Sequence, residues 1–142
     1  MNEYLSFKQN QRQKIIEKIK QILLNKEEVI FAFIFGSFLN EPSFRDIDIG
    51  VYLKDIKEED VFNYELKLEE IVAKGSKLAF DIVEIKVLNF APNYFLNNIF
   101  TRGQLLFCKN YPLLSEMIED TSLDALSNEY IAYQSLKELV EN

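Results

Sequence analysis

Three aspartates stand at positions where their side chains could bind a divalent cation. Asp46 and Asp48 begin the alternating stretch DIDIGVYL (46–53), so on a β-strand both carboxylates point to the same side. Adjacent carboxylates repel each other unless a cation lies between them. Asp81 interrupts the apolar stretch LAFDIVEIKVL (78–88), where an aspartate is costly unless it is paired, binds a cation or faces a cleft. If these two strands pair, the pattern predicts a single carboxylate site. For an isolated Asp-x-Asp pair, the alternative is an acidic strand face exposed to solvent.

A glycine-serine pair precedes these acids and could bind phosphate. Gly36 follows an apolar stretch and permits an unusual φ or a close backbone approach, and Ser37 is a favoured helix N-cap. A helix beginning there would point free amides outward, as phosphate-binding sites do. An ordinary turn is the alternative for Gly-Ser alone. Glu84, three residues after Asp81, is expected on the opposite face of its strand and is left out of the predicted site.

Together, a phosphate cradle and three carboxylates predict a Mg²⁺ site for a nucleoside triphosphate. The composition excludes several other chemistries. There is no histidine and one cysteine, Cys108, so histidine acid-base catalysis and zinc sites built from His or Cys are excluded. The formal charge of −7 argues against direct nucleic-acid binding.

The expected location is the cytoplasm. A lone cysteine cannot form an internal disulfide, which fits a reducing compartment. Residues 1–14 lack the apolar segment of a signal peptide, and no apolar run approaches the ~18 residues of a membrane span.

The charge is uneven along the chain. Residues 1–27 hold six basic and three acidic residues, whereas residues 113–142 hold seven acidic residues and one lysine. Such an acidic end is either a solvated face or a surface for a basic partner.

Helices and strands alternate along the chain and must position the candidate residues. Hydrophobic periodicity predicts helices over residues 6–25, 59–74, 92–102 and 122–140. Strands are predicted over residues 28–35, 46–53, 78–88 and 104–109. The alternative for residues 104–109 is an apolar segment that packs on the core without forming a strand. Gly75 is the expected stop of the second helix, and Ser122 the expected N-cap of the last. The predicted fold class is therefore α/β or α+β, in a single domain over residues 1–142.

The stretch FGSFLNEPSFRDIDIGVYL (35–53), followed by FDIVEI (80–85), resembles the minimal nucleotidyltransferases (MNT) of the DNA polymerase β superfamily. Their signature is Gly-Ser, a loop, Asp-x-Asp on a strand and a third Asp on a neighbouring strand, matched by Gly36, Ser37, Asp46, Asp48 and Asp81. The stretch VLNFAPNYFLNNIFTRGQLLF (87–107) is also similar to this family, so the resemblance covers about residues 28–110. One departure is Phe38, where an arginine is frequent.

This resemblance implies a polymerase β palm-type core with a mixed sheet flanked by helices. It also implies two Mg²⁺ ions, one held by Asp46 and Asp48 and one shared with Asp81, with Gly36 and Ser37 binding the nucleotide. Members of the group resemble antitoxins that transfer AMP from ATP to a tyrosine hydroxyl of a HEPN ribonuclease toxin, with which they form a hetero-oligomer.

Three alternatives remain at this point. One is an inactive antitoxin that neutralises its toxin by binding alone. Another is a subunit of a small-molecule nucleotidyltransferase of the aminoglycoside type. The third is a structural α/β domain without a ligand, which leaves the position of Asp81 unexplained.

Overall fold

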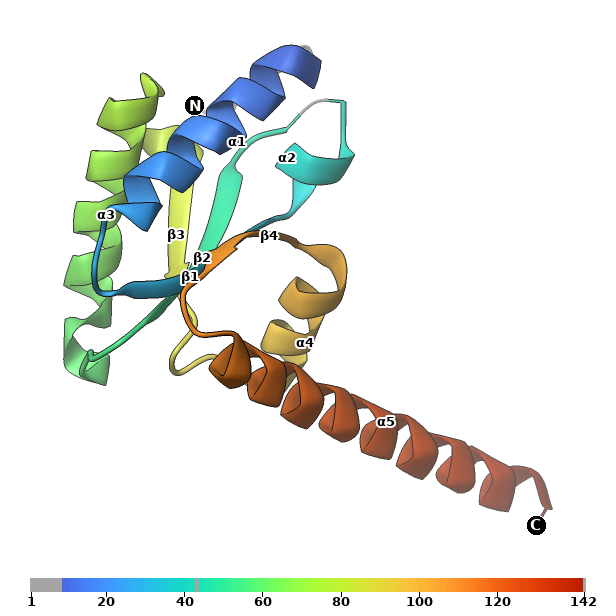
Figure 1. The fold of residues 1–142 in the computed structure, drawn as a ribbon. Helices are drawn as coiled ribbons and strands as arrows, with labels where there is room; N and C mark the ends of the chain where they lie inside the picture. The colour runs from blue at the N-terminus through green and yellow to red at the C-terminus, as the bar shows by residue number, and fades with distance from the viewer. Residues whose placement is uncertain (1–8, 43, 142) are drawn as a thin grey trace.

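The computed structural model describes residues 9–42 and 44–141 (Figure 1). The helices are α1 (Gln9–Leu24), α2 (Ser37–Asn40), α3 (Val61–Ser76), α4 (Asn93–Arg102) and α5 (Tyr111–Glu141). The strands are β1 (Val29–Phe35), β2 (Ile47–Leu53), β3 (Val83–Val87) and β4 (Gln104–Cys108). Short 3₁₀ turns, Glu58–Asp60 and Phe80–Ile82, precede α3 and β3. No helix within the described ranges combines the length and the apolar composition needed to cross a lipid bilayer.

The four strands form one mixed sheet in the order β3-β2-β1-β4. β1 runs antiparallel to both β2 and β4, whereas β2 and β3 are parallel and are connected through α3. This mixed sheet with flanking helices confirms the predicted fold class.

The two faces of the sheet pack against different helices (Figure 1). Aliphatic residues such as Ile34, Ile47 and Ile49 pack with α1 and α3 on one face. On the other face Phe31 and Phe33 pack with α4 and the start of α5. Because side chains alternate along a strand, Asp48 shares this second face with the aromatic residues. Asp48 therefore lies on the side of the sheet that carries α4 and α5.

The edge strand β3 is fixed in register by carboxylates of α3. Glu69 accepts a hydrogen bond of 2.9 Å from the amide of Ile85, and Glu65 accepts one of 2.9 Å from the amide of Val87. These carboxylates satisfy backbone donors that an edge strand would otherwise leave open. Because the amides of β3 are held in this way, its position beside β2 is well defined.

Some predicted boundaries are wrong. The third strand begins at Val83 and not at residue 78, because Phe80–Ile82 form a 3₁₀ turn. Gly75 lies inside α3, which ends where Lys77 adopts a left-handed conformation with φ 57°. Ser122 lies inside α5 rather than capping it. Of the helix predicted over residues 6–25, residues 6–8 lie outside the described part of the chain.

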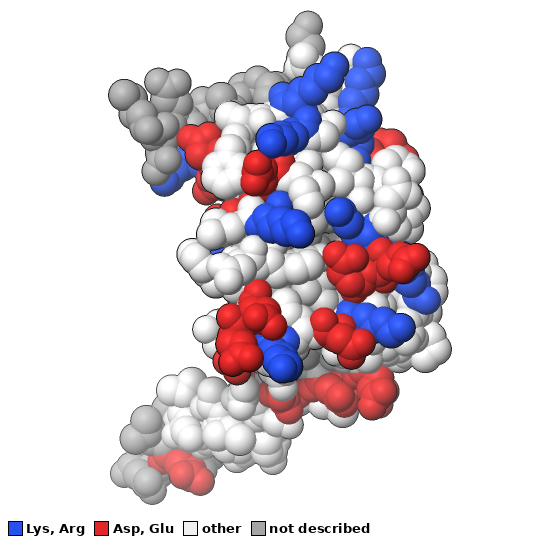
Figure 2. Space-filling view, turned by 90° about the vertical axis from the view of Figure 1, so that its left-hand side faces the viewer, with Lys and Arg blue, Asp and Glu red and all other residues white. Residues whose placement is uncertain are grey.

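Charge is distributed unevenly over the surface, as the sequence predicts. Figure 2 shows Lys and Arg side chains gathered around the end of the molecule that carries α1, and acidic side chains toward α5. On this face, basic side chains are therefore more frequent toward α1 and acidic side chains toward α5.

Candidate active site

The site is built around a direct contact between the Gly36 backbone and the Asp48 carboxylate. Phe35, the last residue of β1, is the register partner of Asp48 in β2, so Gly36 follows immediately beside that carboxylate. Gly36 has a φ of +84°, which side chains rarely tolerate. A Cβ atom placed on Gly36 would lie 2.4 Å from Oδ2 of Asp48. Only glycine therefore fits at this position.

The single turn of α2 begins at this contact. Gly36 occupies the N-cap position and Ser37 is the first helical residue, so the prediction that Ser37 is the cap is wrong by one residue. Helix N-termini leave backbone amides without intrahelical partners. Here that end of α2 lies next to the carboxylate of Asp48. The binding of phosphate by Gly36 and Ser37 remains a prediction.

The neighbour of Asp48 on β3 is Glu84. The parallel register pairs Asp48 directly with Glu84, so both side chains point to the same face of the sheet. The pKa of Asp48 is raised to about 7, chiefly by burial, then by the charges of Glu84 and Asp46 and by a hydrogen bond with Glu84, whereas Lys86 opposes the shift. Asp46, Asp48 and Glu84 therefore form one electrostatically coupled group.

The structure places Asp81 differently from the prediction. Asp81 lies in the 3₁₀ turn before β3 and is exposed, and it is not among the groups that shift the pKa of Asp48. The expectation that Glu84 points away from Asp48 is wrong, because residue 81 does not belong to the strand from which the alternation was counted. Glu84 therefore lies beside Asp48, where the sequence analysis expected Asp81.

The donor set of this group suits a hard divalent cation. Asp46, Asp48 and Glu84 offer only carboxylate oxygens, which Mg²⁺ prefers, and a cation would offset their mutual repulsion. Within the described residues, no three acidic or cysteine side chains converge closely enough to form a complete ion site on their own. Mg²⁺ usually keeps waters and takes phosphate oxygens as further ligands, so a partial protein site is compatible with nucleotide binding.

The raised pKa of Asp48 predicts how the metal-free protein responds to pH. Well below pH 3.8, which is its ordinary pKa, the Asp48 carboxyl is protonated in both the folded and the unfolded state. As the pH rises toward 7, the unfolded state releases the proton more readily than the folded state, so the free energy of unfolding falls. We expect a lower melting temperature at pH 8 than at pH 5, and we expect Mg²⁺ to reverse part of the loss.

Asp48→Asn is the control for this measurement, because it removes the titrating group and keeps the shape of the side chain. The difference in melting temperature between variant and unchanged chain should grow in favour of the variant from pH 5 to pH 8. A constant difference over that range would contradict a raised pKa.

An arginine of α1 holds the segment that carries the candidate residues. Arg12 is buried and donates hydrogen bonds of 2.5 Å to the carbonyl oxygens of Phe38 and Pro42. Its guanidinium carbon lies 5.4 Å from the ring centroid of Phe38 and 5.1 Å from that of Phe44. Arg12 therefore links α1 to the connection between Gly36 and Asp46. The burial of Arg12 could have been predicted from its position in the sequence. Residue 12 lies on the same side of the helix as the buried residues Ile16, Ile19 and Leu23.

Arg12→Met should lower the free energy of unfolding by about 2–4 kcal/mol, because two carbonyl groups lose a charged donor while the apolar stem is kept. The loosened loop should also weaken binding of a non-hydrolysable ATP analogue. Urea unfolding and calorimetry measure the two effects. Lys14→Met, at an exposed position of α1, is the matched control. Equal unfolding midpoints for the two variants would contradict this role of Arg12.

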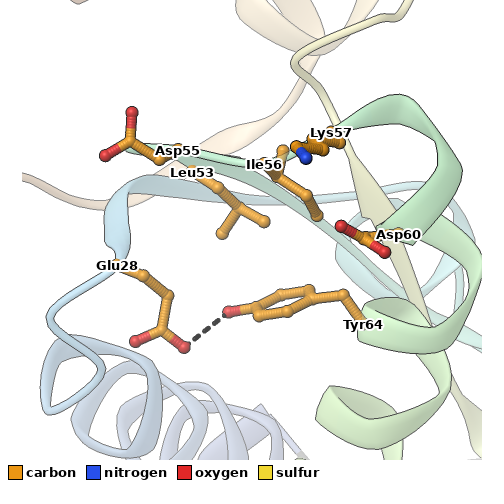
Figure 3. A pocket seen from close by; sticks show the side chains of 7 residues that line it. All are labelled: Glu28, Leu53, Asp55, Ile56, Lys57, Asp60 and Tyr64. Carbon is orange, nitrogen blue, oxygen red and sulfur yellow. Dashed lines mark hydrogen bonds between the residues drawn. The ribbon is translucent and has the colours of Figure 1, made fainter.

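A separate pocket of about 550 Å³ lies at the opposite end of the sheet (Figure 3). Its lining includes Glu28 and Leu53, which adjoin the start of β1 and the end of β2, whereas Gly36 and Asp48 lie at the other ends of these strands. The hydroxyl of Tyr64 donates a hydrogen bond of 3.0 Å to Glu28 there. Burial, followed by this bond, raises the pKa of Tyr64. The pocket is therefore separate from the candidate active site.

The fold and the site together define a nucleotidyltransferase core: a mixed sheet, a glycine-serine turn at the end of one strand and an Asp-x-Asp pair on the next. Residues 17–112 match the family described as "Polymerase beta, Nucleotidyltransferase". This match covers more than half of the chain, and the chain belongs to that family. A search of curated protein sequences finds no match.

Solved structures of toxin–antitoxin complexes contain similar chains. One comes from the tri-AMPylated Shewanella oneidensis HEPN toxin in complex with MNT antitoxin, with 19% identity, a TM-score of 0.60, and 92% of this chain and 99% of the other covered. Another comes from the toxin–antitoxin MntA-HepT, with 18% identity, a TM-score of 0.54, and 95% and 100% covered. A third, from a toxin–antitoxin with AMP-PNP, has 17% identity, a TM-score of 0.56, and 96% and 100% covered. At these identities the likeness establishes the fold.

Proposed function

We propose that this chain is a Mg²⁺-dependent nucleotidyltransferase that acts as the antitoxin of a HEPN toxin. It would transfer AMP from ATP to a tyrosine hydroxyl of the HEPN ribonuclease, so that the hydroxyl oxygen bonds to the α-phosphorus and pyrophosphate leaves. This proposal rests on one observation. The Gly36 backbone packs against the Asp48 carboxylate, and Asp46 and Glu84 lie close to that carboxylate. That arrangement supports one position for a triphosphate and its cation.

The proposed roles follow from position. The first turn of α2 and the Ser37 hydroxyl would bind phosphate oxygens. Asp46 and Asp48 would hold the cation, with Glu84 as the third carboxylate and Asp81 as the alternative that the sequence favours. Two Mg²⁺ ions, when bound, supply charge neutralisation for the triphosphate and a lower pKa for the attacking hydroxyl. A carboxylate beside that hydroxyl could accept its proton.

The structural relatives support the choice of acceptor. The Shewanella oneidensis complex contains an AMPylated HEPN toxin, and another complex contains AMP-PNP. We extend both features to this chain as part of the proposal, because the folds are similar and the chain belongs to the nucleotidyltransferase family. We also propose that the chain acts as a single domain in the cytoplasm, where the free thiol of Cys108 stays reduced.

The test is transfer of label from α-labelled ATP to a HEPN protein, with Mg²⁺ and with EDTA; a HEPN reading frame adjacent to the gene of this chain, if present, supplies the protein to use. Label should appear on a tyrosine of the HEPN protein only with Mg²⁺, and its ribonuclease activity should fall in parallel. If the chain inhibits the ribonuclease without any transfer, it is a binding-only antitoxin. If label instead appears on an aminoglycoside, it is a small-molecule nucleotidyltransferase.

A further inference from the structure

The last helix extends far beyond the part of it that packs on the body. α5 spans 31 residues, and its first turns are anchored where Leu114, Met117 and Thr121 face the α4 side. Asn93 of α4 also donates a hydrogen bond to Asp124. Beyond this region α5 runs away from the rest of the molecule (Figure 1). The projecting part has no neighbour within the described chain that could bury its side chains.

That projecting part carries an apolar band, which we call the α5 seam. Its members are all more than half exposed: Leu123 56%, Leu126 61%, Tyr130 64%, Tyr133 62% and Leu136 63%. The first four follow one another at intervals of three, four and three residues, which is the spacing of a coiled-coil interface. Contiguous exposed apolar surface of this kind marks an interaction site in a soluble protein. The spacing indicates that the partner surface is itself helical.

Charge distinguishes between possible occupants of the α5 seam. Residues 113–142 contain seven acidic residues and one lysine, and Figure 2 shows acidic side chains on the visible part of α5. Asp120 and Glu129 fall at the positions that flank a coiled-coil seam, where charged pairs select the partner. A second copy of the chain would place like charges opposite one another, which is unfavourable. A helix with an apolar stripe and flanking Lys or Arg residues fits the surface.

The position of α5 relative to the site supports a protein substrate as this occupant. α5 packs on α4, and Phe95 of α4 contacts Phe35 edge to face with ring centroids 5.9 Å apart. Phe35 directly precedes Gly36, so α4 and α5 lie on the same face of the sheet as Asp48. A protein held by α5 would therefore lie on the side of the sheet where transfer occurs.

We propose that the α5 seam is the docking surface for a basic, amphipathic helix of the HEPN partner. The identity of the partner rests on the proposed function, whereas the apolar and basic character of its helix follows from the surface of α5.

The experiment compares a double variant, Leu126→Glu with Tyr130→Glu, with the single variant Ile131→Glu. Ile131 is 61% exposed on the same helix but lies about 100° around the helix from Tyr130, off the seam. Binding of the HEPN protein used in the transfer test is measured by calorimetry with each variant of the 142-residue chain. The double variant should bind at least about 100-fold more weakly, as loss of central apolar contacts does, and Ile131→Glu should bind within about threefold of the unchanged chain. Both should bind AMP-PNP as the unchanged chain does.

Three results would overturn the proposal: equal HEPN binding by the double variant, equal loss in both variants, or self-association of the unchanged chain that the double variant abolishes. The outcome is separable from that of the proposed function. Seam-dependent binding without AMP transfer would support the docking surface and reject the transferase role. AMP transfer at an equal rate by the double variant and the unchanged chain would support the transferase role and reject the docking surface.

Discussion

The Asp48→Asn variant is expected to transfer AMP at least about 1,000-fold more slowly than the unchanged chain, because losing one cation ligand removes about 4 kcal/mol of charge stabilisation at the reacting phosphate. An amide oxygen carries no net charge and binds a divalent cation far more weakly than a carboxylate. Asp48 is central to the site because the Gly36 backbone contacts it on one side and Glu84 adjoins it on the other. Single-turnover transfer of label over a range of Mg²⁺ concentrations measures the effect.

Asp55→Asn is the matched control for this variant. Asp55 is an exposed aspartate beyond the far end of β2, so its loss should leave the transfer rate within about twofold. Asp48→Asn should fold, since removing a half-buried carboxyl with a raised pKa relieves repulsion at neutral pH. A folded Asp48→Asn variant that transfers AMP at the normal rate would show that the cation binds elsewhere.

The strands next to the site could be predicted from local pattern alone. The apolar stretch before Gly36 and the alternation after Asp46 became β1 and β2 with boundaries one residue from the expected ones. The pairing of these strands brings Gly36 to Asp48, and both residues belong to the predicted site. Local spacing succeeds here because a short connection joins two adjacent antiparallel strands.

The third carboxylate could not be predicted in the same way. Its position depends on where β3 begins and on its register with β2, both of which are set by contacts with distant parts of the chain. The apolar residues before Val83 read as strand, yet Phe80 is 53% exposed and belongs to a turn. Counting alternation from Asp81 therefore placed Glu84 on the wrong face.

Two further features of the structure were not predicted from the sequence. Phe38 departs from the family pattern, and its ring packs edge to face against Phe44 beneath the Arg12 guanidinium. Arg12 is 26 residues from Phe38, so its contact with these rings joins distant parts of the chain. The start of α5 was placed at Ser122 because serine favours N-caps, but Pro112 is compatible with the first turn of a helix that begins at Tyr111. The start at Tyr111 also has a local cap, because Asn110 accepts a hydrogen bond of 3.2 Å from the amide of Leu113.

Glu84→Gln and Asp81→Asn together decide which acid completes the site. We expect Glu84→Gln to slow AMP transfer by about 100-fold, because the glutamine keeps the shape of the side chain but loses the charge beside Asp48. We expect Asp81→Asn to stay within about threefold, because Asp81 is exposed in the turn before β3. The same transfer assay measures both variants. The ion pair of Glu84 with Lys86, at 3.5 Å and half exposed, contributes little to stability, so its loss does not confuse the comparison.

A second readout separates the two acids without relying on activity. Glu84 raises the pKa of Asp48 by its charge and by a hydrogen bond, so Glu84→Gln should lower that pKa and reduce the loss of stability of the metal-free protein between pH 5 and pH 8. Asp81→Asn should leave this pH dependence unchanged. If Asp81→Asn abolished transfer and Glu84→Gln did not, Asp81 would be the third ligand, and the turn that carries it would have to move toward Asp48 when the nucleotide binds.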